Sequence, residues 1–105
     1  MRYSLRDLAG VIRSKNAGPY ELTFDVMFRD DESFRLVTTN NVINPEMISA
    51  LYSIKKSDII DIVFFPNARA VKVTVVRPLP SGALGERDVY GAQQHGPLAD
   101  YTFEL

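Results

Sequence analysis

The chain contains no cysteine, a single histidine and no long apolar run, and each absence excludes classes of function. Without cysteine it can form no disulfide, thiolate nucleophile, iron–sulfur cluster or cysteine-rich zinc site. No apolar run approaches the roughly 20 residues needed to span a bilayer, and residues 1–10 lack the apolar core of a signal peptide. We therefore expect a cytoplasmic protein with no membrane partner.

The chain also lacks an excess of charge of either sign. The sequence has twelve Lys and Arg residues and thirteen Asp and Glu residues, for a formal net charge of -1. A nearly neutral protein has no bulk field that draws it to nucleic acid, and basic patches interleaved with exposed aromatics are absent. The one histidine has no carboxylates at ligand spacing. The sequence thus predicts no nucleic-acid partner, no metal site and no cofactor.

What is present is ordinary globular composition in a short chain. Hydrophobic residues make up 46% and charged residues 24% of 105 residues, which is enough for one domain with a real core and too short for two. We expect residues 1–105 to form a single domain.

The first third of the chain predicts a helix, a loop and two strands. Ser4 can cap a helix that carries Leu5 and Leu8 on one face and ends near residues 10–13; a strand over residues 1–5 that breaks into a turn is the alternative. Residues 14–19 are typical of a loop. Residues 20–28 alternate as a half-buried strand, residues 29–33 form a charged turn, and residues 34–38 return as a second strand.

The clearest helix begins at Asn44 and Pro45, which are favoured at the N-cap and first helical positions, with Ile43 and Ile48 as a hydrophobic staple. Strands over residues 59–65 and 70–77 follow, then a polar loop, and a terminal strand docked in the sheet. This order predicts an α+β fold with one or two helices and a mainly antiparallel sheet, ferredoxin-like (a split β-α-β unit) in its later part.

The first candidate site is the polar segment over residues 13–19. It offers two cations, a hydroxyl, a carboxamide and a glycine, which are groups that hold a carboxylate or phosphate; they are Arg13, Ser14, Lys15, Asn16 and Gly18. A solvated turn is the alternative interpretation. The segment lacks the spacing of a P-loop, so we exclude nucleoside triphosphate binding.

The second candidate surrounds the only histidine. His95 could act as a general base near neutral pH or hydrogen-bond a carbonyl, and Asp88 could orient it or cap a short helix. Gln93 and Gln94 can read a polar substrate edge or satisfy loop backbone, and Tyr90 is a second proton-transfer candidate.

A third group comprises charged strand residues, Asp25, Asp61, Lys72 and Arg77. Cross-strand ion pairing on an open sheet face accounts for them without a function. The same face could equally be covered by a partner chain.

The polar motifs at residues 14–19, 77–78, 81–82 and 88–95 resemble those of a family of short microbial proteins, domain of unknown function 4387, over nearly the whole chain. Its members are typically encoded beside, or fused behind, AtuA-like (acyclic terpene utilisation) proteins. The small C-terminal domain of those proteins is distantly similar, with an Arg-Ser-Gly-Asp-Lys-Gly loop. This chain lacks the acidic residue of that loop. The resemblance implies a small subunit of a catabolic complex that acts on carboxylic acids or CoA thioesters.

The leading hypothesis is that the two polar segments converge in a site shared with a larger AtuA-like chain. Lys15 or Arg13 would neutralise the carboxylate of a small anionic ligand, and His95 would transfer protons. Ser14, Asn16 and the Gly18 backbone would supply hydrogen bonds. The alternative is a non-enzymatic, homo-oligomeric ligand-binding module; an independent enzyme ranks third.

Overall fold

The computed structural model describes residues 1–18, 20–76 and 96–105. Its centre is a four-stranded antiparallel sheet in the order β2-β3-β5-β4, and a separate two-stranded sheet joins β1 to β6. The strands are β1 (Arg2–Ser4), β2 (Ala9–Asn16), β3 (Glu21–Phe28), β4 (Ile59–Phe65), β5 (Ala70–Val76) and β6 (Thr102–Glu104). The helices are α1 (Leu5–Leu8), α2 (Asp31–Thr39), α3 (Pro45–Tyr52) and α4 (Gly96–Ala99), with short 3₁₀ turns η1 (Lys56–Asp58) and η2 (Pro66–Ala68).

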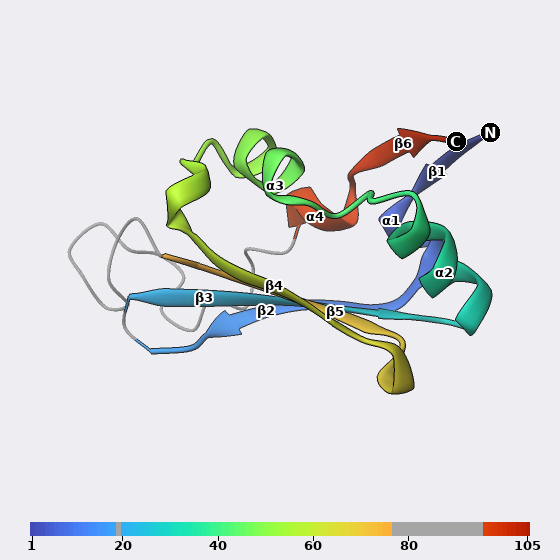
Figure 1. Ribbon diagram of the computed structural model, residues 1–105, viewed down its shortest axis with the longest axis horizontal. Coiled ribbons are helices and arrows are strands. Elements are labelled where there is room, and N and C mark those ends of the chain that lie inside the picture. The colour runs from blue at the N-terminus through green and yellow to red at the C-terminus, as the bar shows by residue number, and fades with distance from the viewer. Residues whose placement is uncertain (19, 77–95) are drawn as a thin grey trace.

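The helices and the small sheet lie on one side of the four-stranded sheet (Figure 1). β3 and β4 are both antiparallel to β5, which lies between them, so β3 and β4 run in the same direction. With α2 and α3 connecting β3 to β4, the strands β3, β4 and β5 form a split β-α-β unit; the sequence analysis expected such a unit in the later part of the chain. The prediction of an α+β fold with a mainly antiparallel sheet is confirmed, but the described residues contain four α-helices where one or two were expected.

The core lies between the sheet and the helices. Each strand of the sheet centre turns alternate side chains toward the helices, and those side chains are almost completely buried. They are Phe24 and Val26 of β3 and Val71 and Val73 of β5, which pack with Leu5, Val37, Ile43, Ile48 and Leu98 from the opposite layer.

The N-terminal helix is shorter than the prediction. Ser4 caps α1, because its side chain accepts a hydrogen bond from the Asp7 amide at 3.2 Å, but the helix ends at Leu8. Residues 9–16 form β2 instead, so the predicted helix over residues 9–13 and the predicted loop over residues 14–16 are both wrong. The backbone of this segment is paired with residues 22–28 of β3, and a pairing partner that distant is not visible in local periodicity.

The predicted strand over residues 34–38 is also wrong, because this segment lies in helix α2. The Asp30 side chain accepts a hydrogen bond from the Ser33 amide at 2.8 Å and so caps the helix. Phe34 and Val37, three positions apart, are buried on its inner side. Asp31 and Glu32, which the sequence analysis placed in a charged turn, lie in the first turn of α2, where negative side chains are favoured.

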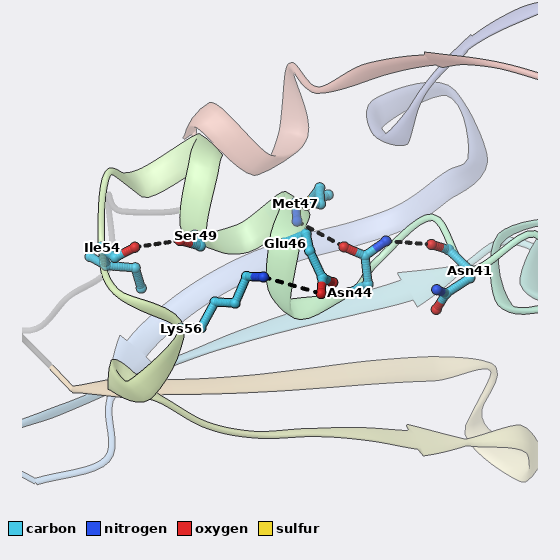
Figure 2. A network of polar contacts seen from close by, with 7 residues as sticks. All are labelled: Asn41, Asn44, Glu46, Met47, Ser49, Ile54 and Lys56. Carbon is cyan, nitrogen blue, oxygen red and sulfur yellow. Dashed lines mark hydrogen bonds and ion pairs between the residues drawn. The ribbon is translucent and has the colours of Figure 1, made fainter.

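The helix predicted after Asn44 is confirmed as α3. The Asn44 side chain accepts a hydrogen bond from the Met47 amide at 2.8 Å and donates one to the Asn41 carbonyl at 2.7 Å (Figure 2). Ile43 and Ile48, the predicted staple, are 1% and 0% exposed. The strands predicted over residues 59–65 and 70–77 are present as β4 and β5, and Arg77, at the end of the second prediction, lies outside the described residues.

The terminal strand is present as β6 but does not join the main sheet. It pairs with β1, and the Tyr3 and Phe103 rings stack with centroids 5.8 Å apart. The prediction that it docks in the sheet is therefore wrong. β1 offers an alternative antiparallel partner that local sequence signals do not identify.

Candidate functional site

The candidate site lies on the sheet face that turns away from the helices, which we call the outer face (Figure 1). Because Phe24 points into the core, its neighbours Thr23 and Asp25 point to the outer face. The cross-strand register then sets Arg13, Asp25 and Lys72 in one row and Lys15, Thr23 and Thr74 in the next. Three cations therefore share this face.

Arg13 is held in place by an ion pair. Its Nε lies 3.2 Å from an Asp25 carboxylate oxygen, with the Asp25 side chain only 17% exposed and that of Arg13 57% exposed. Asp25 also lies opposite Lys72 on its other side. One carboxylate thus sits between two cations, and the terminal nitrogens of Arg13 can still take part in binding an anion, because a guanidinium carries five N–H donors.

Lys15 is exposed and lies beside two buried hydroxyl residues. Thr23 and Thr74 are 1% and 8% exposed, and the Thr23 hydroxyl donates a hydrogen bond to the Lys15 carbonyl at 3.3 Å. This hydrogen bond links the C-terminal end of the edge strand β2 to β3, so it positions the backbone that carries Lys15.

The structure separates the polar side chains of the first predicted site. Ser14 lies opposite Phe24 and Asn16 lies opposite Leu22, so both point to the helix-covered side, and Ser14 is 4% exposed. Gly18, just beyond the strand, has φ 128°, a value that side chains rarely tolerate. A ligand on the outer face can contact Arg13 and Lys15 but not the Ser14 side chain, because strand alternation puts them on opposite sides.

The second predicted site lies outside the described residues. This applies to Asp88, Tyr90, Gln93, Gln94 and His95. The convergence of the two polar segments therefore stays a prediction.

Neither Arg13 nor Lys15 lines any of three hollows on the described surface. One of about 530 Å³ lies beside α2, and one of about 370 Å³ lies between α3 and β4. The third, of about 240 Å³, is lined by Arg6 and Arg29, which the sequence reading did not single out. Arg6 is paired with Asp100 at 2.6 Å, and the Arg29 Nε donates to the Ala9 carbonyl. No sequence motif marks these two arginines.

Among the described residues, the groups with shifted pKa values are Asp30, Glu46 and Tyr52, which lie at or within helices and outside the candidate site. Burial raises the pKa of the Tyr52 phenol, whose ring packs on Phe24 at 4.8 Å. The hydrogen bond from the Ser33 amide lowers the pKa of Asp30, and a backbone hydrogen bond and Lys56 lower that of Glu46. None of these three groups lies among the predicted site residues. Within the described ranges, no three His, Cys, Asp or Glu residues are grouped closely enough to hold a metal ion.

Comparison with known proteins identifies the family. No curated protein and no solved structure matches the chain. No helix among the described residues is long and apolar enough to cross a membrane. The family model described as "Domain of unknown function (DUF4387)" matches residues 5–102. Because that match covers nearly all of the 105 residues, the chain belongs to the DUF4387 family.

Proposed function

We propose that this chain is the small, cytoplasmic component of an AtuA-like catabolic system that acts on carboxylic acids or CoA thioesters. In this proposal Arg13 and Lys15 bind the anionic group of a ligand held between the outer face and a larger chain. The observation that carries it is the outer face itself. Among the described residues the helices lie only on the other side of the sheet, and the outer face carries the cations Arg13, Lys15 and Lys72 beside the Asp25 carboxylate.

The need for a larger chain follows from electrostatics. An ion pair between exposed groups in water contributes about 0–1 kcal/mol, too little to bind a small molecule alone. The Arg13 and Lys15 side chains are exposed, and neither residue lines any of the three hollows described above. A second surface that excludes water would strengthen the same contacts, because charge interactions grow as the local dielectric falls. The family resemblance supports an AtuA-like chain as that surface.

The two cations would have different roles at such an interface. Asp25 fixes the Arg13 guanidinium through Nε, which leaves its planar end for two oxygens of a carboxylate or phosphate. Lys15 would add a second positive charge from the adjacent row. His95 stays the predicted proton-transfer group of this site, supported by its sequence context alone.

Co-expression with the larger AtuA-like chain tests the proposal. Co-elution on size-exclusion chromatography is expected for the wild type and for Lys55→Ala, which removes an exposed lysine from the linker after α3. The double variant Arg13→Ala/Lys15→Ala should lose binding of the ligand to the assembled complex. Titrating an acyl-CoA and the matching free acid separately distinguishes the two ligand sources. Separate elution of the wild-type chains at micromolar concentration, or full ligand binding by the double variant, would contradict the proposal.

A further inference from the structure

Strand β4 is an apolar edge strand. It lies at one end of the strand order and, among the described residues, pairs only with β5. Four of its seven side chains are large exposed hydrophobics: Ile60 is 48%, Val63 37%, Phe64 41% and Phe65 44% exposed. An edge strand presents unpaired backbone N–H and C=O groups, and a long apolar one readily pairs with another chain.

The opposite edge strand, β2, carries the features that usually prevent such pairing. It has a bulge between Ala9 and Val11 and the charged residues Arg13 and Lys15 along its length. In β4 the bulge lies at the start, between Ile59 and Asp61, and Asp61 is the only charged residue. The regular run over residues 61–65 therefore has neither a bulge nor a charge at its centre, so the two edges differ in kind.

We propose that β4 pairs antiparallel with β4 of a second copy of this chain, about a two-fold axis at Val63. Val63 is the middle residue of the regular run. In this register Val63 lies opposite Val63 of the second copy, and Ile62 lies opposite Phe64 of that copy. The two four-stranded sheets would become one sheet of eight strands. The dimer uses the sheet edge and not the outer face, so it does not rest on the function proposed above.

The chemistry of the strand favours a second copy over an unrelated chain. Antiparallel pairing about this axis sets apolar side chains against apolar ones at the three central positions, and each contact occurs twice because a two-fold interface is isologous. On the helix side, Ile62 and Phe64 border the hollow of about 370 Å³, whose other walls include Ile43 and Pro45. Phe64 of the second copy, opposite Ile62, would cover the mouth of that hollow.

The size of the contact sets the strength expected. A strand of seven residues is roughly 23 Å long, and the molecule is 23 Å deep across its sheet and helix layers. Their product is roughly 500 Å² of flat cross-section on each copy, below the roughly 800 Å² of a standard interface. We therefore expect a dimer that dissociates in the micromolar range.

Light scattering coupled to size-exclusion chromatography of the isolated chain tests the proposal. The wild type should approach twice its 11.8 kDa mass as its concentration rises through the micromolar range. Val63→Lys and Val63→Glu should each remain monomeric, because each sets two like charges opposite one another at the axis. A mixture of the two variants should regain the dimer mass, since the facing charges are then opposite. Val11→Lys makes the same change at an exposed valine of β2 and should dimerise like the wild type.

Cysteine cross-linking checks the register directly, because the chain has no cysteine of its own. Val63→Cys should form a covalent dimer under mild oxidation, since directly paired residues lie within disulfide reach, whereas Val11→Cys should not. Circular dichroism confirms that each variant is folded. A wild type that stays monomeric, a dimer that survives Val63→Lys, or a mixture of charged variants that stays monomeric would each overturn the proposal.

Discussion

The strongest quantitative prediction concerns Asn44, whose side chain makes two separable hydrogen bonds (Figure 2). Its Oδ1 accepts from the Met47 amide and caps α3, and its Nδ2 donates to the carbonyl of Asn41, a residue with φ 52°. Loss of an N-cap costs about 1 kcal/mol, and loss of a second hydrogen bond costs about 1 kcal/mol more. Asn44→Ala should therefore lower the free energy of unfolding by about 2 kcal/mol. Asn44→Ser, which can still cap the helix, should lower it by about 1 kcal/mol.

Urea denaturation followed by circular dichroism measures these differences. In a thermal scan of a chain of this size, Asn44→Ala should lower the melting temperature by about 8 °C. Asn40→Ala is the matched control: it removes only an exposed hydrogen bond to the Leu36 carbonyl, so a loss of about 0.5 kcal/mol or less is expected. Equal losses for the serine and alanine variants at Asn44 would show that the cap contributes nothing, and a serine variant as stable as the wild type would show that the Asn41 bond contributes nothing. A loss no larger than that of Asn40→Ala would refute the reasoning.

Two further predictions concern the core and the acid limb of stability. Phe24 is 0% exposed and packs on the Tyr52 ring, so Phe24→Ala should lower the free energy of unfolding by about 3–5 kcal/mol; a loss below 1 kcal/mol in urea denaturation would contradict this. Asp30 has a pKa below its ordinary value of 3.8, chiefly because of the hydrogen bond from Ser33. The ionised carboxylate therefore adds stability that is fully present above pH 3.8 and is lost as the pH falls through the lower, folded-state pKa. Asp30→Asn, which can cap but cannot titrate, should lose less free energy of unfolding than the wild type as the pH falls below 3.8. The same pH dependence in both proteins, measured by urea denaturation, would contradict this prediction.

Local signals were sufficient for part of the fold. The α3 helix follows from Asn44 and Pro45, because capping and proline geometry act within a few residues. The strands β3, β4 and β5 follow from alternation and β-branched content. These interactions are short in sequence, so the residues that make them can be read together.

Prediction from local signals was wrong in segments whose residues fit both a helix and a strand. Residues 34–38 suit either a strand or a helix, and the cap from Asp30 and the burial of Phe34 and Val37 decide for the helix. The opening segment continues a helical spacing of apolar residues to Ile12, yet residues 9–16 pair with β3. In a segment this short, a few apolar residues fit both periods.

For the candidate site, the sequence by itself identified Arg13 and Lys15 as anion-binding side chains and marked Ser14 and Asn16 beside them. Only the tertiary structure decided that the two cations point to the outer face and the other two side chains to the helix-covered side. The physical reason is that alternation applies only once a segment is a strand. Whether residues 9–16 form one depends on backbone hydrogen bonds to β3, and those bonds exist only in the folded chain.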